Sequence, residues 1–149
     1  MVILNGSKII INNYKNIENI DDLKNFNFSL IDIDLWRYSK KKILTSKNKI
    51  GIKINSDQSI DDLFSNLDFF HLIVFNFLSF KDGRPFSHAR ELRENLNFKK
   101  EIRASGYILP DQYIFLKRCG FDTVEVEEGK VKIWTEIYKK NEWLNYQSY

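Results

Sequence analysis

The pattern of apolar and polar positions changes about one third of the way along the chain. Residues 2–4 and 7–11 are two short apolar-rich segments on either side of Asn5 and Gly6. Because Asn and Gly tolerate positive φ, this arrangement predicts an N-terminal hairpin with a type I′ turn. Residues 12–48 are rich in Asn and Lys and predict only a short strand at residues 29–33 and a helical turn at residues 34–42.

From residue 49 onward, strand-like and helix-like segments alternate four times. The expected strands are residues 49–54, 71–78, 101–106 and 123–127, and the expected helices are residues 60–67, 87–96, 111–119 and 131–144. Residues 71–78 are almost continuously apolar, which is typical of a strand covered on both faces. Short connections between such units favour right-handed crossovers. The sequence therefore predicts an α/β fold: four consecutive βα units with a parallel sheet, open or half-barrel-like, preceded by a small N-terminal β-hairpin.

Size and composition favour one soluble domain. With 149 residues, of which 43% are hydrophobic, the chain predicts a single domain over 1–149. Residues 1–48 form its hairpin and irregular extension, and residues 49–149 form its βα-repeat core. The single cysteine, Cys119, excludes an internal disulfide and indicates a reducing compartment. The longest later apolar run, residues 72–80, is about half the ~20 residues of a membrane helix, so we expect a cytoplasmic protein without membrane contact.

The charge pattern and motifs exclude several classes of function. The net charge is +3, and residues 37–53 are basic without any acid, whereas residues 122–128 are acidic. In a lysine-rich chain such a basic run is typical of a solvated face, and no interleaved aromatic series accompanies it, so nucleic-acid binding is not expected. No dinucleotide fingerprint, P-loop or nucleophile elbow is present, and His71 and His88 are isolated. We therefore expect no cofactor and no metal.

Two polar loops follow predicted strands and precede predicted helices. Asp82, Gly83, Arg84 and Ser87 follow residues 71–78, and Asp111 and Gln112 follow residues 101–106. Ligands of parallel α/β proteins lie at the carboxyl ends of the strands, where helix N-termini offer free amide donors. We expect Ser87 and Asp111 to cap their helices and the two loops to share one anion-receptive cleft.

The arginines are concentrated in the same region. The chain has 17 lysines and 6 arginines, yet five arginines lie between residues 84 and 118. A planar guanidinium holds an oxyanion through two parallel hydrogen bonds, which lysine cannot do. The alternative interpretation is that these arginines form scaffold salt bridges with nearby acids. The predicted ligand-binding residues are Asp82, Gly83, Arg84, Ser87, Arg90, Arg103, Asp111 and Gln112.

Several short strings in this region resemble one protein family. These strings are FKDGRPFSHARELR at residues 80–93, EIRASG at residues 101–106, DQ at residues 111–112 and RCGFD at residues 118–122. In this order they resemble the bacterial domain of unknown function 934 family, whose members are commonly labelled as involved in sulfite reduction. The resemblance is dense from about residue 51 to residue 126. It departs at Pro85, where the family usually has glycine, and at residues 107–112, where a carboxylate and an arginine of the family are missing.

The resemblance implies a pathway rather than a reaction. It implies an accessory protein of assimilatory sulfite or sulfate reduction that binds a sulfite reductase subunit, another sulfur-assimilation enzyme or a small anion. The alternative is a small enzyme acting on an anionic metabolite, with Asp82 or Asp111 as acid or base and arginines binding the anion. No catalytic residue is assigned, and whether the protein is an enzyme stays open. If the sheet is a half-barrel, its exposed strand edges would favour a homodimer.

Overall fold

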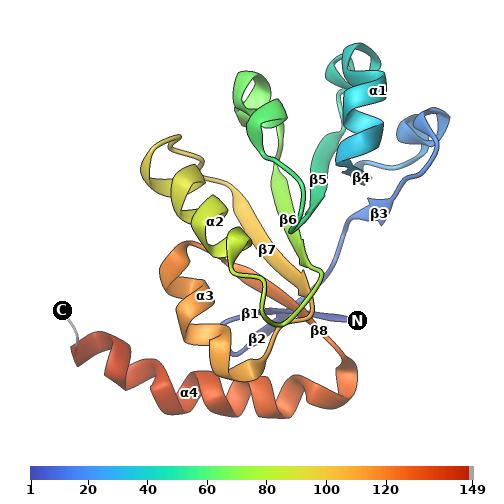
Figure 1. Cartoon of the computed structure of the whole chain (residues 1–149). Helices are drawn as coiled ribbons and strands as arrows, with labels where there is room; N and C mark the ends of the chain where they lie inside the picture. Colours follow the sequence, from blue (N-terminus) through green and yellow to red (C-terminus); the bar gives the residue numbers. More distant parts are fainter. Residues whose placement is uncertain (148–149) are drawn as a thin grey trace.

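Short apolar segments pair into one curled sheet in the computed structural model, which describes residues 1–147 and the side chains of residues 1–142. The strands in these residues are β1 (Val2–Asn5), β2 (Lys8–Ile10), β3 (Lys15–Asn16), β4 (Phe28–Asp32), β5 (Lys49–Asn55), β6 (Leu72–Phe77), β7 (Glu101–Gly106) and β8 (Thr123–Val126). Across the sheet they follow the order β2-β1-β8-β7-β6-β5-β4-β3 (Figure 1). The chain has a mixed α/β fold whose sheet curls into a half-barrel.

Strands β3 to β8 are parallel, and each pairs with its neighbour in sequence. β1 is antiparallel to β8, and β2 is antiparallel to β1. Parallel strands need a crossover segment between them, and these segments contain the helices. The pairing of β6 with β7 confirms the prediction that the strands near residues 71–78 and 101–106 are parallel neighbours.

α-Helices and 3₁₀ helices lie in the crossover segments and after β8. They are η1 (Ile20–Asn25), α1 (Ile33–Leu44), η2 (Asp61–Phe69), α2 (Arg84–Glu94), η3 (Pro110–Gln112), α3 (Tyr113–Cys119), η4 (Glu128–Lys130) and α4 (Val131–Gln147). The helix expected at residues 60–67 is present as η2, which is a 3₁₀ helix rather than an α-helix. Phe70, which follows η2, packs edge-on against Trp36 of α1, with ring centroids 4.8 Å apart.

The segment between the hairpin and β5 is more regular than its composition indicates. The strand and helical turn expected at residues 29–33 and 34–42 are present as β4 and α1. The side chain of Asp32 accepts a 2.7 Å hydrogen bond from the backbone N–H of Leu35 and so caps α1. Residues 15–44 thereby add the strands β3 and β4 to the same sheet and form the helix α1.

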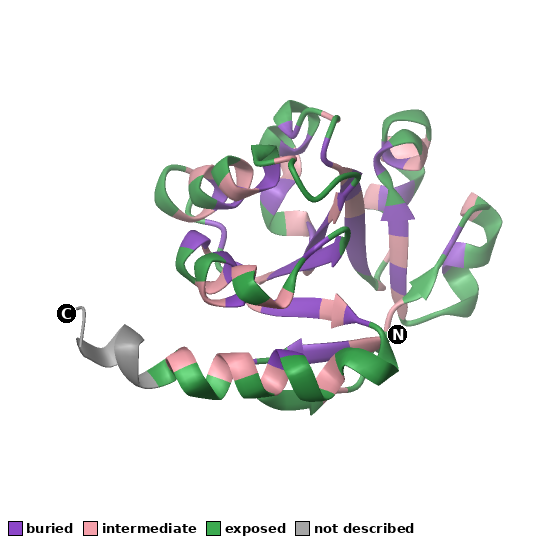
Figure 2. Ribbon diagram, turned by 60° about the horizontal axis from the view of Figure 1, so that its bottom comes forward, coloured by how far each residue is buried: buried purple, intermediate pink, exposed green. Residues whose placement is uncertain are grey.

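The two faces of the sheet differ in polarity. On the outer face Ile54, Phe75 and Ala104 are fully buried, and the Phe75 ring lies 5.8 Å from the ring of His88 in α2. Strand side chains alternate between faces, so the intervening residues point to the inner face. There the register of β5 to β8 aligns Lys53, Val74, Arg103 and Thr123 in one row. Figure 2 shows the buried strands beneath helices whose outward surfaces are exposed.

The N-terminal hairpin forms, but the predicted type I′ turn is wrong. Asn5 pairs with Lys8, so the turn residues are Gly6 and Ser7, and only Gly6 has positive φ, at 63°. A positive φ at the first central position alone is the pattern of a type II′ turn. Tertiary contacts fix this register, because the Gly6 carbonyl accepts a 2.7 Å hydrogen bond from the hydroxyl of Tyr113.

A four-residue connection joins the two opposite edges of the sheet. β2 ends at residue 10 and β3 begins at residue 15, so residues 11–14, here named the strap, cross between the edges (Figure 1). In a flat sheet with strands about 4.8 Å apart, these edges would be roughly 34 Å apart. An extended connection from residue 10 to residue 15 reaches only about 18 Å. The covalent link therefore requires the sheet to curl.

Candidate functional site

The exit loops of β6 and β7 lie side by side at one end of the sheet, here named the carboxyl edge. Phe77 and Gly106 pair at the ends of the two strands, and the Phe77 carbonyl accepts a 2.9 Å hydrogen bond from the N–H of Tyr107. The Asp82 loop and the Asp111 loop therefore leave the same end of the sheet. No contact joins Asp82 directly to Asp111 among the interactions of the described residues.

Gly106 is required where β7 meets its exit loop. Its φ is +86°, and a Cβ there would lie 2.4 Å from the Phe77 carbonyl oxygen and 2.6 Å from Oδ1 of Asn76. Only a residue without a side chain fits so close to the neighbouring strand. The loop is thereby held directly against the end of β6.

Three polar side chains form a ladder across the ends of β5, β6 and β7. Nδ2 of Asn76 donates to Oδ1 of Asn55 at 3.0 Å, and Oγ of Ser105 donates to Oδ1 of Asn76 at 3.2 Å. Sequence analysis missed this ladder. Asn76 is the one polar residue in the β6 sequence LIVFNF, and that interruption was the available signal.

Asp82 and Arg84 form a bidentate ion pair in the β6 exit loop. Nε and NH2 of Arg84 donate to the two carboxylate oxygens of Asp82 at 3.0 and 2.7 Å. Arg84, together with a hydrogen bond from Ser56, holds the pKa of the Asp82 carboxyl far below its usual value. The Asp82 side chain is 11% exposed, whereas that of Arg84 is 58% exposed. The Asp82 carboxylate thus holds the Arg84 guanidinium in place, while more than half of the Arg84 side chain remains exposed to solvent.

The predicted helix caps are absent. α2 begins at Arg84 rather than at Ser87, because Pro85 supplies the fixed φ of a first helical turn. Gly83 precedes the helix and makes no side-chain cap, and Ser87 is exposed within the first turns. Asp111 is exposed in η3 and caps neither η3 nor α3. Gln112 fills the capping role, since its Oε1 accepts a 3.0 Å hydrogen bond from the N–H of Leu109.

The remaining predicted arginines do not join Asp82 and Arg84. The guanidinium of Arg90 lies 5.7 Å from the ring centroid of Phe115 on the exposed side of α2. Arg103 is 2% exposed on the inner face of β7, where Nε and NH2 contact Oε2 of Glu101 at 3.0 and 2.7 Å. Of these arginines, Arg84 therefore lies in the β6 exit loop at the carboxyl edge, whereas Arg103 does not.

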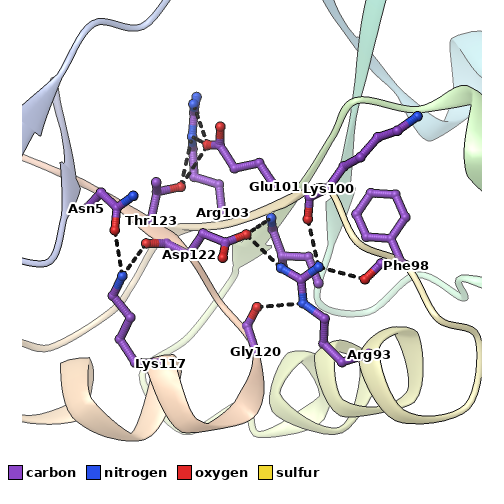
Figure 3. A network of polar contacts seen from close by, with 11 residues as sticks. Asn5, Arg93, Phe98, Lys100, Glu101, Arg103, Lys117, Gly120, Asp122 and Thr123 are labelled. Carbon is purple, nitrogen blue, oxygen red and sulfur yellow. Dashed lines mark hydrogen bonds and ion pairs between the residues drawn. The ribbon is translucent and has the colours of Figure 1, made fainter.

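Arg93, one turn beyond Arg90, has a structural role (Figure 3). Its nitrogens donate to the backbone carbonyls of Phe98, Lys100 and Gly120 at 2.7 to 3.0 Å. It also pairs with Asp122 at 2.6 Å. This network ties the end of α2 to the start of β7 and to the residues before β8, as the scaffold interpretation of the arginines predicts.

Apolar side chains stand exposed beside the Asp82–Arg84 pair. Leu78, Phe80, Tyr107 and Leu109, here named the edge cluster, are 41 to 56% exposed and come from the β6 and β7 exit loops. The rings of Phe80 and Tyr107 meet edge-to-face with centroids 5.2 Å apart. Both border a cavity of about 460 Å³ that reaches Trp134 of α4.

These features define the chain as an α/β half-barrel protein whose carboxyl edge carries exposed apolar side chains beside the Asp82–Arg84 ion pair. Residues 51–148 match the family described as bacterial protein of unknown function (DUF934), and the chain belongs to this family. No curated protein and no solved structure matches the chain. Within the described residues, no cluster of three His, Cys, Asp or Glu side chains could hold a metal ion. None of the helices in residues 1–147 is long and apolar enough to cross a membrane.

Proposed function

We propose that this protein is a non-catalytic accessory protein that binds a partner protein through its carboxyl edge. The observation that carries the proposal is the edge cluster, in which four large apolar side chains are exposed on two adjacent loops. Aromatic side chains flanked by an arginine are the typical anchors of protein interfaces, and Arg84 lies in the same loop as Phe80. The sulfite-reduction label of the family makes a sulfite reductase subunit the proposed partner.

An enzymatic function has weaker support. A general acid must carry a proton at neutral pH, whereas Arg84 and Ser56 hold the pKa of Asp82 low and keep its carboxylate ionised. The ion pair occupies Nε and one N–H of NH2 of Arg84, which leaves NH1 and the second N–H of NH2 for contact with a partner or an anion. The local chemistry therefore favours recognition over proton transfer.

Binding assays with purified sulfite reductase test the proposal. We expect the double variant Phe80→Ser/Tyr107→Ser to weaken the complex at least tenfold in biolayer interferometry, because two buried anchors would be lost. Phe64→Ser is the matched control, since Phe64 is 43% exposed on η2, away from this edge, and its loss should leave affinity unchanged. Absence of binding by the parent chain, or equal binding by the double variant, contradicts the proposal.

Arg84 is also the proposed contact for a small anion at this edge, such as sulfite. Arg84→Lys keeps the positive charge but removes the planar fork. We expect this variant to weaken sulfite binding at least fivefold in calorimetry if the anion uses Arg84. Unchanged sulfite affinity would remove Arg84 from the site.

A further inference from the structure

A second cavity lies at the opposite end of the strands, beneath the strap. Its volume is about 320 Å³, and the strap residues Ile11, Asn13 and Tyr14 form one wall. The other wall consists of residues at the starts of the parallel strands. These residues are Phe28, Lys49, His71, Glu101 and Arg103. This amino-end cavity shares no lining residue with the cavity at the carboxyl edge.

We propose that the amino-end cavity binds a small oxyanion through Arg103 and Lys49. A guanidinium has five N–H donors. Nε of Arg103 donates to Glu101 and Thr123, and NH2 donates once to Glu101 (Figure 3). NH1 donates once to Asn12 at 3.2 Å. One N–H on each terminal nitrogen has no acceptor among the described residues. A buried hydrogen-bond donor without an acceptor costs free energy, and a bound oxyanion would accept hydrogen bonds from both of these N–H groups.

The Glu101 carboxylate does not remove this preference for an anion. Its Oε2 already accepts from Nε and NH2 of Arg103 and from Oγ1 of Thr123, at 2.7 to 3.0 Å. Glu101 therefore orients the guanidinium and neutralises a single charge. Lys49 supplies a second positive charge, with its Nζ 5.3 Å from the ring centroid of Phe28. The net charge of the lining side chains is positive.

His71 gives an independent indication of this positive environment. Partial burial lowers its pKa, and the positive charges of Lys100 and Lys49 lower it further. Its Nδ1 is buried without a hydrogen-bond partner among the described residues. When the neutral ring carries its proton on Nδ1, this nitrogen can donate a hydrogen bond to a bound oxyanion.

Calorimetry with the full chain tests the proposal, using sulfate, phosphate and succinate separately at constant ionic strength. We expect saturable one-to-one binding of at least one anion. The anion that binds distinguishes a tetrahedral oxyanion from a carboxylate. Lys49→Gln should raise the Kd at least fivefold, whereas Lys41→Gln, which removes an exposed charge on α1, should change it less than twofold. The Lys49 variant is preferred to an Arg103 variant because it leaves the buried Arg103–Glu101 pair intact.

NMR of the two histidine rings locates the bound anion. His71 lines the amino-end cavity, whereas His88 packs on the outer face against Phe75. We expect the saturating anion to shift the ring resonances of His71 and to leave those of His88 in place. The proposal is overturned if none of the three anions saturates, or if the bound anion leaves His71 unmoved.

Discussion

NH1 of Arg103 in β7 donates a 3.2 Å hydrogen bond to Oδ1 of Asn12, which lies 91 positions earlier in the chain. This bond attaches the strap to the middle of the inner face of the sheet. The same Asn12 oxygen accepts from the N–H of Tyr14 at 3.2 Å, so one side chain both shapes and anchors the strap. Asn12 is thus the residue that links the strap to Arg103.

Asn12→Ala should loosen the strap without unfolding the sheet. We expect a loss of about 1 kcal/mol in the free energy of unfolding, typical of one removed hydrogen bond. Hydrogen exchange of residues 11–14 should become faster. Asn13→Ala is the control, because Asn13 is exposed in the same strap and its replacement should change neither quantity. Identical exchange in the Asn12 variant and the parent would contradict the anchoring role.

Gly106→Ala should be strongly destabilising, whereas Gly83→Ala should not. A Cβ at residue 106 would collide with the Phe77 carbonyl at a φ of +86°. We expect a cost of about 2 kcal/mol or more from backbone strain alone. Gly83 has nothing within 4 Å of a Cβ and a φ of −91°, so its replacement should be neutral or stabilise by at most about 1 kcal/mol. Urea unfolding of both variants measures the difference.

Arg93 and Arg90 lie on one helix but should differ sharply in their effect on stability. Arg93→Ala would leave three backbone carbonyls without this donor and would leave Oδ2 of Asp122 with only the N–H of Ile102. We expect a loss of about 2 to 4 kcal/mol in the free energy of unfolding. Arg90→Ala removes only the contact with Phe115, so about 1 kcal/mol or less is expected. Similar melting temperatures for the two variants would refute the scaffold role of Arg93.

Stability should fall as the pH drops below about 6.5, the usual pKa of histidine. Burial lowers the pKa of both His71 and His88 in the folded chain. The unfolded chain therefore binds more protons between the folded and unfolded pKa values, and protonation favours unfolding. The pKa of Asp82 is also lowered. The stability that its ionised carboxylate gives the folded chain is lost only when the pH falls below 3.8, the usual pKa of this carboxyl. Urea unfolding should give a lower free energy of unfolding at pH 5.5 than at pH 7.5. In the double variant His71→Gln/His88→Gln this difference between the two pH values should be smaller.

The alternation of strands and helices after residue 49 could be predicted because each element carries a local signal. β6 is apolar at every position except Asn76, and Gly120 ends α3 with a φ of 114°. The curl of the sheet could not be predicted in this way. It depends on β1 pairing with β8 and on the shortness of the strap, and no local pattern encodes a pairing between distant segments.

The placement of the candidate site was predictable in part. Asp82 and Arg84 follow the end of β6, so the position of a loop was enough to place them at the carboxyl edge. Arg103 instead lies in the middle of β7 between the buried residues Ile102 and Ala104. Strand alternation already required its side chain to point away from the helices. The arginines between residues 84 and 118 therefore have different roles. Arg84 lies at the carboxyl edge, Arg93 stabilises the scaffold, and Arg103 lies on the inner face of the sheet.

The pairing of β1 with β8 also sets the order in which the fold can be completed. Val2 pairs with Val126, so β1 has only its hairpin partner β2 until β8 has been made. Until then Ile3 and Leu4, both buried in the finished sheet, remain exposed in the nascent chain. Contacts so distant in sequence form slowly, and docking of the N-terminal hairpin is expected to be a late step in folding. β1 therefore acquires its second neighbouring strand, β8, only after β3 to β7 have been made.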